Sequence, residues 1–327
     1  MKILVTGGAG FIGSHLCEAL LQDGHKVICL DNFDPFYHPS SKWANIAPAQ
    51  QHPGYQLIEG DIRDHRLLQR IFTKNTFDAV VHLAAKAGVR PSISQPDEYF
   101  DVNVRGTLQL LEAMAGSQVP RLLFASSSSV YGNQAKTPFT ESDDVSHPIS
   151  PYAASKRSGE LLAHAYHHLY GLDVACLRLF TVYGPRQRPD LAIHKFAQLA
   201  LEQKPIPLYG NGQTRRDYTY VADIVQGIRQ LLHQPGFGYE IFNLGGGAPV
   251  TLKGMVRALE ITLGQKLKIE YLPKQAGDVD QTFADISKAN AYFGYQPAVS
   301  LPEGVKRFVA WFLQHEPAMA LMQQVNQ

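Results

Sequence analysis

Short apolar runs alternate along the first half of the chain with segments in which apolar residues recur every three or four positions. The short runs are typical of buried strands, and the periodic segments are typical of amphipathic helices. The pattern predicts strands at residues 2–6, 26–30, 55–59, 79–83, 121–125 and 174–180. It predicts helices at residues 11–21, 64–72, 99–115 and 151–170. The chain is therefore expected to have an α/β fold.

Regular strand–helix alternation is the signature of a doubly wound parallel sheet, a Rossmann-like arrangement whose ligands bind at the carboxyl ends of the strands. Small or polar residues follow the predicted strands directly at these ends. They are Gly7, Asp31, Asp61, Ala84, Ser127 and Thr181. We expect them to line one crevice, although close packing alone also accounts for the small residues at 84 and 85.

A glycine turn joins the first predicted strand to the first predicted helix. Gly7, Gly10 and Gly13 are spaced GxxGxxG, and a turn of this kind presents backbone N–H groups and a helix N-terminus to a pyrophosphate. Asp31 ends the next strand, where an acid can bind a ribose diol. No Arg or Lys follows Asp31 immediately, so a 2′-phosphate would face an uncompensated carboxylate. The pattern therefore favours NAD over NADP.

The second half of the chain is more interrupted. It carries predicted helices at residues 192–202, 221–233 and 252–264, and short strands at residues 206–209 and 239–244, with Pro and Gly between them. Loops of this composition can close over a nucleotide. We expect a NAD-binding domain at residues 1–180, to which 221–245 returns, and a sugar-nucleotide-binding domain made mainly of 181–327.

Composition gives no indication of a nucleic-acid-binding, membrane-binding or disulfide-rich protein. The 327 residues are 45% hydrophobic, and 30 Lys and Arg stand against 29 Asp and Glu, so no charge field points to nucleic acid or to a membrane surface. Three cysteines without paired spacing predict neither a disulfide framework nor a metal site. The first residues form no signal peptide, and we expect a cytoplasmic protein.

The candidate chemistry lies at Tyr152 and Lys156, four residues apart on one predicted helix face. An ammonium beneath the phenol would favour its ionised form, which turns a tyrosine into a base. The alternative, a solvated i,i+4 pair on a helix surface, is common. What favours chemistry is the neighbouring segment, Ala125 to Gly132, which reads ASSSSVYG.

The motifs VTGGAGFIGSHL, LDNF, GDIRD, HLAAKAGVR, SSSSVYG, PYAASK, LRLFTVYGPRQRPD and NLGGG together resemble the extended short-chain dehydrogenase/reductase family and, within it, the nucleotide-sugar epimerases. The resemblance implies a catalytic group of Ser127, Tyr152 and Lys156, with Tyr152 as acid and base. It also implies a homodimer. Dehydratases of the family usually carry an Asp-Glu pair where this chain reads SSSS, which argues against elimination of water.

Carried over position by position, the resemblance implies one set of residues that binds NAD and another that binds a UDP-sugar. NAD is expected to contact Gly7, Gly10, Phe11, Ile12, Gly13, Asp31, Asn32, Asp61, Ile62, Leu83, Ala84, Ala85, Lys86, Asn103, Ser126, Tyr152, Lys156 and Val182. A UDP-sugar is expected to contact Arg90, Ser127, Ser128, Tyr152, Thr181, Arg186, Arg188, Leu208, Tyr209, Gln213, Arg216 and Asp278.

The segment FTVYGPRQRPD resembles that of the UDP-glucuronate 4-epimerases and points to Arg188, with Arg186 as second choice, as the partner of a substrate carboxylate. A guanidinium fork can bind a carboxylate bidentately. Both arginines could instead bind the diphosphate or the loop backbone. Three other functions remain open: a neutral-hexose 4-epimerase, a UDP-glucuronate decarboxylase, and a non-catalytic dinucleotide-sensing protein.

Overall fold

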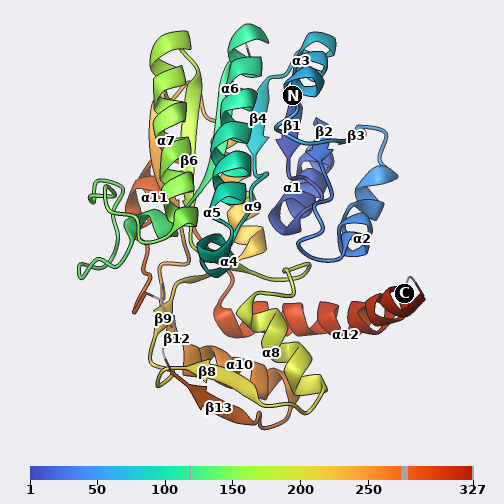
Figure 1. The fold of residues 1–327 in the computed structure, drawn as a ribbon, viewed down its shortest axis with the longest axis vertical. Coiled ribbons are helices and arrows are strands. Elements are labelled where there is room, and N and C mark those ends of the chain that lie inside the picture. The colour runs from blue at the N-terminus through green and yellow to red at the C-terminus, as the bar shows by residue number, and fades with distance from the viewer. Residues whose placement is uncertain (118, 274–278, 326–327) are drawn as a thin grey trace.

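Seven parallel strands form the central sheet, in the order β11–β6–β5–β4–β1–β2–β3 (Figure 1). The computed structural model describes residues 1–117, 119–273 and 279–325. The strands of the sheet are β1 (Lys2–Thr6), β2 (Lys26–Asp31), β3 (Tyr55–Glu59), β4 (Ala79–His82), β5 (Arg121–Ser127), β6 (Asp173–Leu179) and β11 (Tyr239–Leu244). The predicted Rossmann-like doubly wound sheet is confirmed, and β11 returns to it by pairing with β6.

Helices cover both faces of the sheet. One face carries α3 (His65–Lys74), α6 (Gly106–Ser117) and α7 (Pro151–Tyr170), and the other carries α1 (Phe11–Gln22) and α9 (Val221–Leu232). Each face of the sheet packs against its helices in a separate hydrophobic core. Successive residues of β5 alternate between these cores: Leu122 and Phe124 lie in the core with α3, α6 and α7, and Leu123 lies in the core with α1 and α9. Strands buried on both faces explain the continuous apolar runs of the sequence.

The strand order reverses between β1 and β4, and this switch point fixes the location of the ligand crevice. Three loops meet there: the glycine turn after β1, the segment after β2 that leads to α2 (Pro39–Gln50), and the segment after β4 that leads to α4 (Val89–Ser94). The predicted helix at 99–115 is α5 (Pro96–Phe100), a π-helical turn at Asp101–Arg105, and α6.

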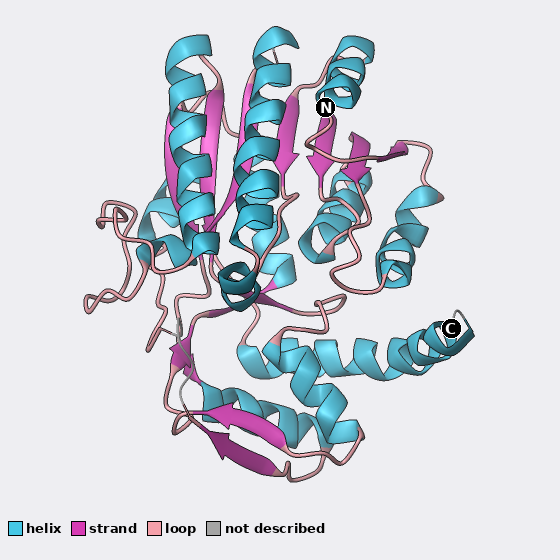
Figure 2. Cartoon of the chain, viewed as in Figure 1, coloured by secondary structure: helices cyan, strands magenta, loops and turns pink. Residues whose placement is uncertain are grey.

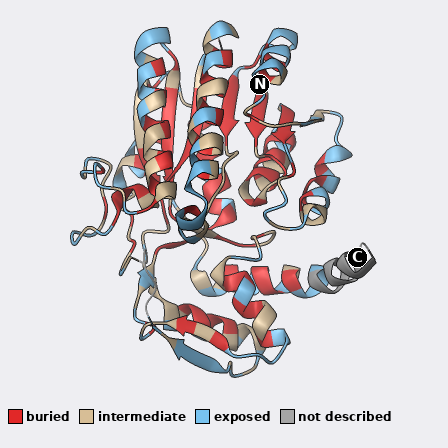
Figure 3. Ribbon diagram, viewed as in Figure 1, coloured by how far each residue is buried: buried red, intermediate tan, exposed pale blue. Residues whose placement is uncertain are grey.

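Below the sheet in Figures 1 and 2 lies a smaller layered region. It contains α8 (Ala192–Leu201), α10 (Leu252–Leu263), α12 (Leu301–Val325) and the parallel pair β8 (Ile206–Tyr209) and β13 (Ile269–Leu272). Figure 3 shows buried positions continuing from the sheet into the start of α12, where Phe308 and Phe312 are fully buried. The outer strand β13 is largely exposed.

Short elements that the hydrophobic pattern did not predict connect these layers. They are α2, α4, the 3₁₀ turn Ser128–Tyr131, β7 (Thr181–Tyr183) with β10 (Tyr218–Tyr220), β9 (Arg215–Arg216) with β12 (Val250–Thr251), β13, and α11 (Ser287–Phe293). Within the described ranges, no helix has the length and apolar character needed to cross a membrane.

Candidate active site

A cavity of about 490 Å³ opens at the carboxyl ends of β1, β2, β4, β5 and β6. Every residue predicted to contact the dinucleotide lines it, with the exception of Asn103. Of the residues predicted to contact the sugar nucleotide, Ser127, Ser128, Tyr152, Thr181 and Arg188 line it. Part of the predicted sugar-nucleotide site therefore shares one cavity with the predicted dinucleotide site.

The glycine turn is shaped for close approach. Gly7 has φ +71°, and a Cβ there would lie 2.7 Å from the backbone nitrogen of Ala84. A Cβ on Gly13 would lie 2.2 Å from the carbonyl oxygen of Gly7. Helix α1 begins at Phe11, and no side chain caps it at Gly10. Its first N–H groups therefore border the cavity without a side-chain cap, as a pyrophosphate requires, so this part of the crevice fits a dinucleotide.

Asp31 has a cationic neighbour that the sequence analysis missed. Its carboxylate accepts hydrogen bonds from the backbone N–H groups of Ala9 (3.1 Å) and Phe33 (2.9 Å) and lies 3.3 Å from Nζ of Lys42. The expectation of an uncompensated carboxylate is therefore wrong, because helix α2 brings Lys42 back to the end of β2. Lys42 also lines the cavity, beside the predicted ribose site.

Asn103 does not line the cavity but hydrogen-bonds a residue that does. Its side chain accepts a hydrogen bond from the N–H of Lys86 (2.8 Å) and donates to the carbonyl of Lys86 (2.9 Å) and to Ser155 (3.0 Å). The π-helical turn places this amide between the end of β4 and helix α7. Asn103 thus fixes the backbone of a lining residue.

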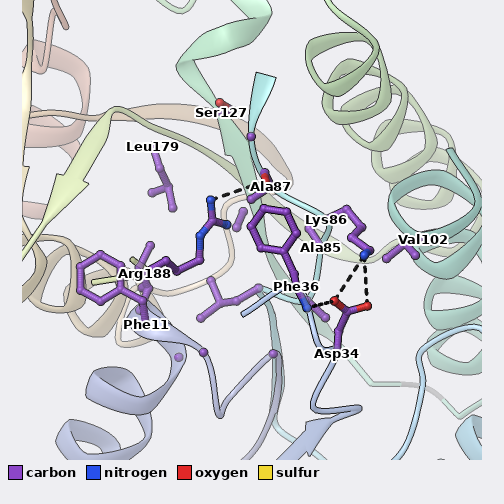
Figure 4. A pocket seen from close by; sticks show the side chains of 18 of the residues that line it. Phe11, Asp34, Phe36, Ala85, Lys86, Ala87, Val102, Ser127, Leu179 and Arg188 are labelled. Atoms are coloured by element: carbon purple, nitrogen blue, oxygen red, sulfur yellow. Dashed lines mark hydrogen bonds and ion pairs between the residues drawn. The ribbon is translucent and has the colours of Figure 1, made fainter. Parts of the chain in front are cut away.

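Lys86, which lines the cavity, bridges two carboxylates. Its ammonium lies 3.2 Å from Asp34 and 2.8 Å from Glu98. Figure 4 shows the ring of Phe36 between Lys86 and Arg188. The centroid of this ring is 5.8 Å from Nζ of Lys86 and 5.2 Å from Cζ of Arg188, so both cations lie within cation–π distance of one ring.

The proposed catalytic group comes from two elements. Ser127 ends β5, while Tyr152 and Lys156 occupy the first turns of α7, a helix capped by Ser150 and opened by Pro151. Nζ of Lys156 donates a 2.7 Å hydrogen bond to the carbonyl of Ala125. Burial lowers the pKa of Lys156 to about 8, and the carboxylate of Glu160 opposes this shift.

Opposing influences act on the phenol of Tyr152. Burial raises the pKa of its phenol, a hydrogen bond with Ser127 lowers it, and the charge of Arg188 lowers it further. Lys156 was also expected to favour the ionised phenol, and this role stays a prediction, since its ammonium keeps further donors beside the hydrogen bond to Ala125. The charge of Arg188 thus favours the ionised form of Tyr152.

The remaining substrate candidates lie away from this cavity. Arg90 stacks on the ring of Tyr209, with Cζ 5.0 Å from the ring centroid, and so connects α4 to β8. Leu208 is fully buried, Gln213 lies in the loop after β8, and Arg216 lies in β9. Arg186 points to α1, where it pairs with Glu18 at 2.8 Å. Asp278 lies outside the described residues.

With this geometry in place, comparison with known proteins identifies the family. A family model described as GDP-mannose 4,6 dehydratase matches residues 4–308. The chain belongs to this family. The resemblance to extended short-chain dehydrogenases and nucleotide-sugar epimerases is also confirmed, because a UDP-glucuronate 4-epimerase of Thermodesulfobacterium geofontis is 44% identical over 94% of this chain and 95% of its own.

Solved structures of the family share the fold. The UDP-glucuronic acid 4-epimerase of Bacillus cereus, crystallised with UDP-glucuronic acid and NAD, is 38% identical with a TM-score of 0.91, over 96% of this chain and 99% of its own. The dTDP-glucose 4,6-dehydratase DesIV of Streptomyces venezuelae is 35% identical with a TM-score of 0.90, over 97% and 98%. Members with different activities thus have nearly the same backbone, and the site residues must distinguish between them.

In this chain the segment after β5 carries hydroxyl groups. Ser127 accepts a hydrogen bond from the N–H of Ser129, and their hydroxyls are 3.1 Å apart. The Asp-Glu pair expected of the family's dehydratases is absent from this described segment. The described segment 126–129 therefore supplies hydroxyl groups beside the candidate base Tyr152, and it supplies no carboxylic acid that could protonate a leaving hydroxyl.

Proposed function

We propose that this protein is a NAD-dependent UDP-sugar 4-epimerase that interconverts UDP-glucuronate and UDP-galacturonate. The observation that carries the proposal is the presence of Ser127, Tyr152 and Arg188 in one cavity at the end of a dinucleotide crevice. The first two serve oxidation and reduction at C4, and the third can bind the carboxylate at C5. The 44% identity to a UDP-glucuronate 4-epimerase supports the same activity.

The residues of the chain have separate tasks in this reaction. Tyr152 removes the proton of the C4 hydroxyl and later returns it, while Ser127 hydrogen-bonds the same oxygen. When bound, NAD supplies the reversible hydride acceptor that oxidation at C4 requires. The glycine turn would hold its pyrophosphate, Asp31 its adenosine ribose, and Lys156 the region beside the nicotinamide ribose. The cavity gives the keto sugar room to turn, so that C4 is reduced on its opposite face.

Arg188 has a second task because the oxidised sugar is a β-keto acid. Carbon dioxide leaves such a compound easily when the bond to the carboxylate aligns with the carbonyl π system. A guanidinium that keeps the carboxylate ionised and out of this alignment would suppress the loss. This protection separates an epimerase from a decarboxylase on the same fold.

Incubation of the purified protein with UDP-glucuronate, followed by NMR of the products, tests the proposal. The expected product is UDP-galacturonate, with no net NADH release. A UDP-pentose as the main product would favour the decarboxylase, and absence of any product would favour a dinucleotide-sensing protein. Turnover of UDP-glucose in place of UDP-glucuronate would favour the neutral-hexose epimerase.

We further propose a cytoplasmic homodimer and a division into a NAD-binding part (1–180, with 221–245) and a sugar-nucleotide-binding part (mainly 181–327). Large apolar side chains on α4, α5 and α7 support the dimer, because Ile93, Phe100, Leu161 and Leu169 are all more than 40% exposed. Light scattering on the purified protein, with Leu161→Glu as the test variant, measures the oligomeric state. A dimer that Leu161→Glu converts to a monomer is the expected result.

A further inference from the structure

Two arginines on one loop point to different parts of the molecule. The loop runs from Gly184 to Leu191, between β7 and α8, and Arg186 adopts φ +64° within it. This backbone conformation is rare for a residue with a side chain. Arg186 pairs with Glu18 on α1, at 2.8 Å, while Arg188 lines the cavity. The turn therefore separates a structural arginine from a site arginine.

The backbone around Arg188 is held on both sides. The N–H of Gln187 donates to the carbonyl of Gly184 (3.2 Å), and the N–H of Leu191 donates to the carbonyl of Arg188 (3.2 Å). Nδ1 of His194, on α8, lies 2.7 Å from the carbonyl oxygen of Gln187. The starting point of the Arg188 side chain is thus fixed before any ligand binds.

Asp190 then fixes the guanidinium itself. Nε of Arg188 donates to Oδ1 of Asp190 and Nη2 donates to Oδ2, both at 2.9 Å. Nη2 also lies 3.5 Å from the carbonyl of Ala87, and Phe36 covers one face of the guanidinium (Figure 4). Within the described part of the chain, Nη1 has no hydrogen-bond partner. A guanidinium is planar and rigid, so a bidentate grip on one edge sets the direction of the other.

We propose that Asp190 is a positioning residue for the uronate substrate: it holds the Nε/Nη2 edge of Arg188 so that the Nη1 end meets the C5 carboxylate at an angle that prevents decarboxylation. This assignment rests on the proposed function. Asp190 does not itself line the cavity, and it therefore acts through Arg188.

The bond that Asp190 protects can be stated atom by atom. After oxidation at C4, the C5–C6 bond breaks, its electron pair moves into a C4–C5 enolate, and C6 leaves as carbon dioxide. The enolate takes up one proton at C5, and reduction at C4 then gives a UDP-pentose. The overall change is UDP-glucuronate plus one proton to UDP-pentose plus carbon dioxide. A guanidinium free to rotate would let the carboxylate reach the orientation that starts this sequence.

Asp190→Asn is the test variant, because the amide keeps the shape of the side chain but cannot accept two charge-assisted hydrogen bonds from one guanidinium. Glu18→Gln is the matched control, since it removes the carboxylate partner of the other arginine on the same loop. Each variant is incubated with UDP-glucuronate, and the ratio of UDP-pentose to UDP-galacturonate, kcat, KM and the melting temperature are measured.

We expect Asp190→Asn to lower kcat for epimerisation on the order of tenfold and to raise the pentose share by a similar factor, as a misaligned reacting group does. KM should not rise, because Arg188 keeps its charge. Glu18→Gln should leave the product ratio unchanged. An unchanged product ratio and kcat in Asp190→Asn, in an active wild type, would overturn the assignment of Asp190 alone. The same shift in Glu18→Gln would also overturn it, and an inactive wild type would remove the proposed function with it.

Discussion

Glu160 and Arg178 form an ion pair in which neither side chain is exposed by more than 1%, one helical turn beyond Lys156. Both oxygens of Glu160 accept from Arg178 at 3.0 Å, and Oε1 also accepts from Ser126 at 2.6 Å. Ser126 and Arg178 are paired across β5 and β6. Helix α7 is therefore joined to the end of β5 twice, by Lys156 at Ala125 and by Glu160 at Ser126, directly before the catalytic candidate Ser127.

The pKa of Lys156 predicts how the protein responds to alkaline pH. Burial lowers this pKa from 10.5 to about 8, so the unfolded chain binds more protons than the folded one between these values. The contribution of Lys156 to the free energy of unfolding therefore increases as pH rises through this window. Activity should fall in the same range, because the ammonium proposed to act beside Tyr152 and the nicotinamide ribose loses its charge: kcat/KM should decrease above about pH 8. A rate profile that stays flat to pH 10 would contradict a role for the charged form.

Glu160→Gln tests whether the carboxylate of Glu160 influences the protonation of Lys156. Glu160 raises the pKa of Lys156, so its neutralisation should move the alkaline fall in kcat/KM to lower pH. Removing one member of a buried pair should also lower the free energy of unfolding by about 3–5 kcal/mol. Arg157→Gln is the control, because Arg157 donates to the same carboxylate from a partly exposed position. Arg157→Gln should lower the free energy of unfolding by at most about 1 kcal/mol. A pH profile identical to that of the wild type would show that Glu160 only stabilises the fold.

Tyr152→Phe removes the ionisable oxygen and keeps the ring, which packs edge-on against Tyr99 with centroids 6.1 Å apart. Turnover should fall by ~10² to 10⁴, the usual contribution of general acid–base catalysis. NAD binding and the melting temperature should change little. Kinetics and calorimetry on the same preparation check both statements, and retained turnover would exclude Tyr152 as the base.

Asp31→Asn should weaken NAD binding roughly tenfold or more, because a hydrogen bond to a charged group contributes about 1.5–3 kcal/mol. The variant also leaves Lys42 without its carboxylate partner. Affinity for the UDP-sugar serves as the internal control and should remain nearly constant. Calorimetry that shows equal losses for both ligands would indicate a general disturbance of the fold.

Helices and strands with clear capping residues and apolar periodicity could be predicted from the sequence. Helix α7 begins and ends as predicted, because Ser150 caps it, Pro151 opens it, and Gly171 ends it in the left-handed conformation. Helix α2 was missed because PSSKWANIAPAQ has little apolar periodicity and contains Pro48. With α2 the contact between Lys42 and Asp31 was missed as well.

Two parts of the site depend on contacts that chain order does not reveal. The directions of Arg186 and Arg188 follow from a positive φ inside an irregular loop, where neither helical nor strand periodicity applies. Arg178 did carry a signal, since a charged residue inside the apolar strand VACLRL needs a buried partner. The identity of that partner, Glu160, requires the packing of α7 on β5 and β6.

Arg188→Ala is the variant that separates the candidate substrates. If Arg188 binds the C5 carboxylate, its removal should lower kcat/KM for UDP-glucuronate by about 10² or more, since a charge-assisted contact is lost, and should affect UDP-glucose far less. The variant should also release UDP-pentose, because nothing then holds the carboxylate out of alignment with the C4 ketone.

The charge of Arg188 complicates this comparison in a way that can be measured. Arg188 lowers the pKa of Tyr152, so Arg188→Ala should raise that pKa and slow proton removal from either sugar at neutral pH. Rates should therefore be compared at a pH where each variant reaches its maximum. A loss on UDP-glucuronate that still exceeds the loss on UDP-glucose under these conditions assigns Arg188 to the carboxylate. Equal losses on both sugars would assign it to the diphosphate and make a neutral-hexose 4-epimerase the better interpretation.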